Sequence, residues 1–506
     1  MTDFFKKHTL ITGALLLTMT GFFTRFLGFF YRIFLSRTIG AEGLGLYNMV
    51  HPIYGICFAL CAGSMQTAIS RFVAADASKS KVIFRIGLSI SLSIALLLSL
   101  LIYQGSDFIA RYILLEDRCT SLLPFMAISV PFSAVHACIS GYYYGIRKTK
   151  IPALSQVIEQ VIRMGAVFFI ADILIKSGQA ITVQLAAFGH LIGEAASCFY
   201  AVLAFSLFTP APICPSPSGF FSDFRKTAAP LMTLALPLMG NRLILNVLAS
   251  AEAIWIPNRL LAFGMTGSEA FRIYGVLTGM ALPFILFPST ITNSMAVLLL
   301  PTVSQAQADG NRKRISDTIA MSIRYSLYMG ILCIGIFTLF GKQLGFSVFH
   351  NQNAGSFIRI LAWLCPFLYL STTTGSILNG LGQTSTTFSQ NALALILRLV
   401  FVVFGIPKLG ITAYLWGTLI SEILLASLHL YALKERIPFV WNVRAMILKP
   451  SFFLILSVGI SYATWNVVSL PEVLPEFLQV SLQIALISFC YGGLLLLFHQ
   501  KSVHTS

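Results

Sequence analysis

Fourteen apolar segments run through the sequence, and each is long enough to form a helix that crosses the ~30 Å hydrocarbon core of a bilayer. Only 10% of the 506 residues are charged, against about 25% in soluble domains. The sequence therefore predicts an all-α polytopic membrane protein without a soluble domain. The predicted spans are 9–35, 45–70, 84–104, 119–144, 152–175, 181–208, 227–250, 274–303, 316–340, 355–380, 386–406, 410–433, 447–468 and 474–498.

The loops between the segments divide Lys and Arg unequally. With both termini in the cytoplasm, 19 of the 34 Lys and Arg lie in inside loops and tails, nine lie in outside loops and six lie within segments. This asymmetry follows the positive-inside rule, so we expect a multi-pass protein with both termini cytoplasmic. Topology and contact with anionic lipid then explain much of the net charge of +16, and we expect no nucleic-acid partner.

Two short matches predict an internal repeat. The spacing from Gly145 to Arg163 equals the spacing from Gly380 to Arg398, and the sequence around Glu194 matches that around Glu422 in the same order. Six helices per half make the repeats parallel, an arrangement found in rocking transporters. The predicted domains are an N-terminal six-helix lobe (1–208), a Pro-rich linker (209–224), a C-terminal six-helix lobe (225–434) and two additional helices (435–506).

The first segment carries two arginines, Arg25 and Arg32, seven residues apart. Seven residues are about two helical turns, so both side chains share one face. An arginine at the bilayer centre costs about 2.5–3.5 kcal/mol even on lenient scales. This face is therefore expected to meet water, a counter-charge or an anionic ligand. The alternative for Arg32 is that it marks the helix end and snorkels to the interface.

The matched charges within the repeats allow two interpretations. Arg163 and Glu194 in one half, and Arg398 and Glu422 in the other, are predicted to form structural ion pairs between helices. Alternatively, one carboxylate takes up H⁺ or Na⁺ during a transport cycle. Glu159 and Arg163 are also spaced to pair within one helix.

The remaining sequence indicates no metal or nucleotide cofactor. The eight His do not have metal-ligand spacing, and no Gly-x4-Gly-Lys-Ser/Thr loop occurs. Transport is then expected to draw on the membrane potential or an ion gradient.

Four stretches resemble the multidrug/oligosaccharidyl-lipid/polysaccharide (MOP) exporter superfamily. The resemblance is to its polysaccharide-type branch, which contains stage V sporulation protein B and the lipid II flippases. It covers essentially the whole chain, and its clearest stretches are Thr24–Tyr47, Ala68–Ala74, Leu282–Gln305 and Ile377–Gln383.

The resemblance implies a bacterial cytoplasmic-membrane protein with a V-shaped cavity between its lobes. It implies a flippase for undecaprenyl-pyrophosphate-linked sugars in cell-wall, spore-cortex or exopolysaccharide synthesis, with synthesis enzymes as partners. In lipid II flippases, first-helix arginines bind the diphosphate. Arg25 and Gly28 match that Arg-x-x-Gly pattern, whereas Arg32 follows the glycine by four residues rather than three. The predicted substrate-binding residues are Arg25, Arg32, Arg71 and Arg242. For Arg71, which lies at a segment end, the alternative is that it anchors the topology.

Two other functions are compatible with parts of the sequence. A cation-coupled multidrug exporter of the same superfamily would depend on buried carboxylates and would not need the arginine set. A membrane enzyme acting on lipid-linked sugars would need acidic or His residues at the outer face, but the outside loops are short. The chain is therefore not expected to be an enzyme, and the sequence does not specify the sugar or the coupling ion.

Overall fold

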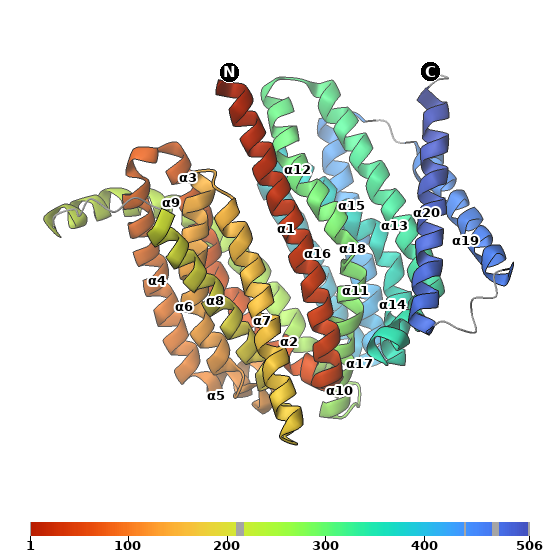
Figure 1. The fold of residues 1–506 in the computed structure, drawn as a ribbon, viewed down its shortest axis with the longest axis horizontal. Helices are drawn as coiled ribbons and strands as arrows, with labels where there is room; N and C mark the ends of the chain where they lie inside the picture. Colours follow the sequence, from red (N-terminus) through yellow and green to blue (C-terminus); the bar gives the residue numbers. More distant parts are fainter. Residues whose placement is uncertain (1, 209–216, 440–441, 468–474, 504–506) are drawn as a thin grey trace. The chain divides into compact units, whose positions relative to one another are not determined.

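The fold is entirely helical over the described residues, which are 2–208, 217–439, 442–467 and 475–503 of a computed structural model (Figure 1). This confirms the predicted all-α class. Contacts divide the chain into two units, Met1–Gly275 and Val276–Ser506. The predicted linker lies partly outside the described residues, because 209–216 are not described and α9 begins at Pro217. The predicted lobe boundaries remain a prediction.

The first unit is built on long apolar helices whose small residues allow close packing. Its core includes Met65 and Ile69 on α3, Ile86 on α4, and Cys138 and Tyr143 on α6. The elements are α1 (Thr2–Thr38), α2 (Gly40–Phe58), η1 (Ala59–Gly63), α3 (Ser64–Ala75), η2 (Ala77–Lys79), α4 (Ser80–Gln104), α5 (Ser106–Phe108), η3 (Ile109–Leu114), η4 (Asp117–Cys119), α6 (Leu123–Gly145), α7 (Lys150–Lys176), α8 (Gln184–Phe208), α9 (Pro217–Ala262) and α10 (Gly267–Gly275).

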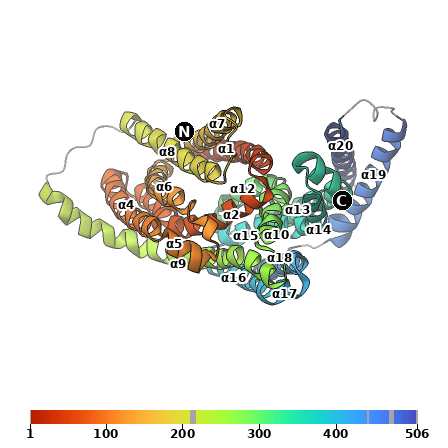
Figure 2. The same cartoon turned by 90° about the horizontal axis from the view of Figure 1, so that it is seen from below.

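The second unit packs α13, α15 and α18 around a core that includes Ile319, Ile323, Ile377 and Leu433. Helices α19 and α20 pack on each other at its edge (Figure 2). The elements are η5 (Val276–Ala281), α11 (Leu282–Leu286), α12 (Ser289–Ala308), α13 (Arg312–Phe349), α14 (Gln352–Leu361), η6 (Ala362–Leu364), α15 (Cys365–Gly380), α16 (Thr384–Val400), η7 (Phe401–Gly405), α17 (Ile406–Leu409), α18 (Ile411–Arg436), η8 (Arg444–Leu448), α19 (Lys449–Val467) and α20 (Glu476–Val503).

Twelve helices or runs of joined helices in the described part of the chain are long and apolar enough to cross a membrane. They correspond to twelve of the fourteen predicted segments. The other two segments form α1 and α7, helices of 37 and 27 residues that are not among these twelve. Both carry ionisable side chains within their length, such as Arg25, Arg32, Glu159 and Arg163. The count of fourteen spans therefore remains a prediction.

Helices α2 and α10 of the first unit cross at two glycines. A Cβ placed on Gly275 would lie 1.8 Å from the carbonyl oxygen of Ala41, and one on Gly45 would lie 2.3 Å from that of Phe271. Only glycine leaves room for backbones this close. This crossing fixes α10 against the start of α2.

Candidate functional site

The arginine face of α1 lies along α7. Gly28 stands between Arg25 and Arg32 on this face, and a Cβ placed on it would be 4.0 Å from Oε1 of Gln160 on α7. Arg25 is exposed and has no ion-pair partner among the described residues. Arg32 lies deeper, within electrostatic range of Tyr47 on α2 and Arg163 on α7. The two arginines thus share a face, as predicted, but differ in surroundings.

Arg32 belongs to a group of polar side chains inside the first unit, which we call the inner polar cluster. Five helices contribute to it, and they are held together by packing of α1 on α7, α7 on α8, and α6 on α2 and α8. Its members are Arg32 of α1, Tyr47, His51 and Tyr54 of α2, His136 of α6, Glu159 and Arg163 of α7, and His190 and Glu194 of α8.

Hydrogen bonds connect the carboxylates of this cluster to their neighbours. Arg163 Nη2 donates to Glu159 Oε1, which confirms the predicted pairing within α7. Glu194, which is buried, accepts a hydrogen bond of 2.8 Å from the Tyr54 hydroxyl. Arg163 lies within electrostatic range of Glu194 but makes its direct ion pair with Glu159, so the predicted pairing of Arg163 with Glu194 stays a prediction. The hydroxyl of Tyr54 reaches Glu194, since α2 also packs against this part of the unit.

Aromatic rings fill the space beside the carboxylates. The His190 ring lies 4.7 Å from that of Tyr54 and 5.5 Å from that of His51, between centroids. The His51 ring in turn contacts Tyr47 at 4.6 Å. His190 is 4% exposed, and neither of its ring nitrogens has a hydrogen-bond partner among the described residues. Leaving a buried polar atom unpaired costs about 1–3 kcal/mol, which marks this part of the cluster as costly to fold.

Three members of the cluster are close enough to hold a cation. Donor atoms of His136, Glu159 and Glu194 all lie within 4.8 Å of one another. Each is already engaged: His136 contacts Ser155 at 2.8 Å and Ser197 at 3.4 Å, and the carboxylates bond Arg163 and Tyr54. A cation or proton would therefore have to compete with bonds that already exist. Sequence spacing does not predict this grouping, because the three residues lie on three different helices.

The matched residues of the second unit form a smaller arrangement. Glu422 on α18 is buried, accepts a hydrogen bond from Ser371 Oγ on α15, and lies within electrostatic range of Arg398 on α16. His429 Nδ1 lies 3.2 Å from the carbonyl oxygen of Ser371. Glu194 and Glu422 thus have similar surroundings, because each is buried and accepts a hydrogen bond from a hydroxyl group on another helix.

Arg242 and Arg71 lie on α9 and α3, not on α1. Arg242, on α9, donates from Nη2 to Thr67 Oγ1 on α3 at 3.2 Å, and its Nη1 lies 2.2 Å from where a Cβ of Gly63 would be. Helix α9 belongs to the first contact-based unit, and the place of Arg242 in the predicted C-terminal lobe (225–434) remains a prediction. Arg71 is exposed near the end of α3. Binding by all four arginines remains a prediction.

Known proteins share this sequence pattern and this fold. The model of the family described as polysaccharide biosynthesis protein matches residues 10–307. Stage V sporulation protein B of Bacillus subtilis (strain 168) is 27% identical over 441 residues, with 85% of each chain covered.

Two solved structures show the same fold at low sequence identity. The inward closed conformation of the lipid II flippase MurJ aligns with a TM-score of 0.73 at 14% identity, covering 97% of this chain and 100% of that one. An inward-facing multidrug resistance MATE family transporter of the MOP superfamily aligns with a TM-score of 0.62 at 14% identity, covering 84% and 98%. The two solved structures are thus those of a flippase and a transporter, and neither of these proteins is an enzyme. The family match spans more than half of the chain, so this protein belongs to the polysaccharide biosynthesis protein family and has the fold of MOP-superfamily transporters.

Proposed function

We propose that this protein is a flippase. It carries an undecaprenyl-pyrophosphate-linked oligosaccharide or peptidoglycan precursor across the cytoplasmic membrane by alternating access. The relatives that support the proposal are a sporulation protein and a lipid II flippase. On this proposal both termini are cytoplasmic, and enzymes of cell-wall, spore-cortex or exopolysaccharide synthesis act before and after the flipping step.

The observation that carries the proposal is the state of Arg25. It lies in the middle of α1, is exposed, and has no ion-pair partner among the described residues. An unpaired guanidinium facing hydrocarbon is costly, so this face is expected to meet water or an anion. A diphosphate presents several oxygens, and the guanidinium fork suits them better than an ammonium group does.

Binding of undecaprenyl-pyrophosphate-linked sugar to the purified protein tests the proposal. Arg25→Ala should lose most of the binding, and Arg25→Lys should restore only part of it, because Lys keeps the charge but loses the fork. Arg147→Ala, in the exposed turn between α6 and α7, is the matched control and should bind as wild type does. Equal binding by Arg25→Ala and wild type would contradict the proposal.

A second candidate function is export of cationic drugs coupled to an ion gradient. The carboxylates of the inner polar cluster, of which Glu194 is buried, favour it, and the MATE transporter shows that the fold supports multidrug resistance proteins. This second function predicts that the folded wild-type protein does not bind the lipid-linked sugar and instead transports cationic drugs.

The inner polar cluster is the proposed coupling site in either case. Glu194→Gln keeps an acceptor for the Tyr54 hydroxyl but cannot change charge, so the dependence of transport on H⁺ or Na⁺ should be lost while substrate binding persists. Tyr54→Phe, which removes the hydroxyl and keeps the carboxylate, should retain that ion dependence. Ion dependence that survives in Glu194→Gln would move the coupling site elsewhere, with Glu422 as the next residue to test.

A further inference from the structure

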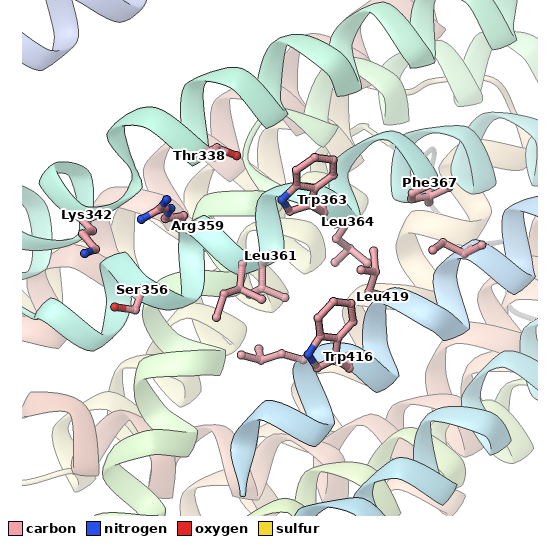
Figure 3. A pocket seen from close by; sticks show the side chains of 13 residues that line it. Thr338, Lys342, Ser356, Arg359, Leu361, Trp363, Leu364, Phe367, Trp416 and Leu419 are labelled. Atoms are coloured by element: carbon pink, nitrogen blue, oxygen red, sulfur yellow. The ribbon is translucent and has the colours of Figure 1, made fainter. Parts of the chain in front are cut away.

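A second site of a different kind lies wholly within the second unit. It is a cavity of about 930 Å³ formed by α13, α14, η6, α15 and α18 (Figure 3). Its wall is mainly apolar, whereas one end holds Lys342 of α13 and Arg359 of α14. Figure 3 shows these two cations toward one end and Trp363, Leu364 and Phe367 toward the other. We call it the lateral groove.

The crossing of α13 and α14 places the two cations together. A Cβ placed on Gly355 would lie 2.7 Å from Cα of Lys342, and one on Gly341 would lie 3.1 Å from the backbone nitrogen of Arg359. The glycine of each helix therefore packs against the backbone that carries the cation of the other. The cationic end of the groove is a consequence of this close crossing.

The charge of this end is not balanced. Lys342 and Arg359 are both exposed, and neither has an ion-pair partner among the described residues. No Asp or Glu lines the groove, whose remaining polar side chains near the cations are the hydroxyls of Thr338 and Ser356. Two unpaired cations beside hydroxyl groups suit the oxygens of a phosphate.

The apolar part of the groove is exposed at the surface of the helices. Trp363 is 54% exposed and Trp416 is 55% exposed, although both line the cavity. Trp is enriched where a membrane meets water, because one end of its ring system is apolar and the other is polar. In this unit, α14 lies at the end opposite the C-terminal end of α20 (Figure 1). The predicted orientation has a cytoplasmic C-terminus, so it places α14 at the outer membrane surface.

We infer that the lateral groove binds one anionic diacyl phospholipid from the surrounding leaflet. The phosphodiester lies between Lys342 and Arg359, and an acyl chain lies along Trp363, Leu364 and Leu419. A zwitterionic headgroup would bring its own cation to a site that already has two, and a soluble anion would leave the apolar wall uncovered. Because none of the α1 arginines lines the groove, this inference does not depend on the proposed flippase activity.

Native mass spectrometry of the detergent-solubilised full chain tests the inference. Phosphatidylglycerol should remain bound under conditions that remove phosphatidylcholine. A cation near an anionic lipid surface contributes about 1 kcal/mol, or about fivefold in affinity, so Lys342→Gln/Arg359→Gln should weaken the retained lipid by about 25-fold. Lys408→Gln/Arg436→Gln removes the same charges at exposed positions outside the groove and should retain it.

A second variant tests the apolar half of the groove. Leu419→Trp, which adds volume inside the cavity, should reduce phosphatidylglycerol binding while leaving the cations in place. Equal retention of the two phospholipids by wild type, or unchanged retention in Lys342→Gln/Arg359→Gln, would overturn the inference. Displacement of phosphatidylglycerol by undecaprenyl phosphate at equal concentration would also overturn it and assign the groove to the carrier lipid. Binding of lipid-linked sugar that depends on Arg25 is measured separately, so failure of either idea leaves the other intact.

Discussion

At the scale of single residues, Glu159 and Arg163 each compensate the charge of the other inside the first unit. Their side chains are only 16% and 13% exposed, and Glu194 lies close by. Removing one partner leaves an uncompensated charge in the helix bundle, which typically costs about 3–5 kcal/mol. We expect Arg163→Met to lower thermal stability in detergent strongly, and Glu159→Met/Arg163→Met to recover most of that loss. If the stability losses of Glu159→Met and Arg163→Met, each measured alone, simply add in the double variant, the two side chains are not coupled.

At the scale of helices, the close crossing of α2 and α10 predicts that Gly→Ala has opposite effects on stability at Gly275, inside the crossing, and at Gly165, outside it. Ala in place of a helical Gly normally gains about 0.5–1 kcal/mol, whereas overpacking costs about 1–3 kcal/mol. Gly275→Ala should therefore destabilise the protein, because its Cβ would meet the Ala41 carbonyl at 1.8 Å. Gly165→Ala, in α7 with no atom within 4 Å of the new Cβ, should be neutral or stabilising. Thermal unfolding followed by fluorescence compares the two, and a loss of stability in both would contradict this packing.

At the scale of the whole molecule, the number of membrane crossings depends on α7. If α7 crosses the membrane, the turns before and after it face opposite sides. Lys148→Cys and Gln179→Cys, both at exposed positions, should then differ in reaction with a membrane-impermeant maleimide applied from outside: only Gln179→Cys should react. The wild-type chain is the control, since seven of its eight described cysteines are buried. Labelling of both positions from the same side would exclude α7 as a span.

Sequence reasoning predicted those features that depend on hydrophobicity and short-range spacing. The all-α class follows from the length of the apolar segments, and the pairing of Glu159 with Arg163 follows from the helical repeat. The shared face of Arg25 and Arg32 follows from the same repeat. These features involve residues within one helix, so their geometry is fixed as soon as the helix forms.

The tertiary structure decided which helices meet, and this changed the candidate site. Tyr54 rather than Arg163 donates a hydrogen bond to Glu194, and His136 lies close to two carboxylates from other helices. Likewise, Lys342 and Arg359 become neighbours only because α13 and α14 cross at glycines. The order of residues alone is sufficient to specify a helical membrane protein with cationic residues inside its apolar segments. Only packing decided the partners of those residues, because contacts between helices depend on side-chain shape over the whole bundle and not on spacing along one helix.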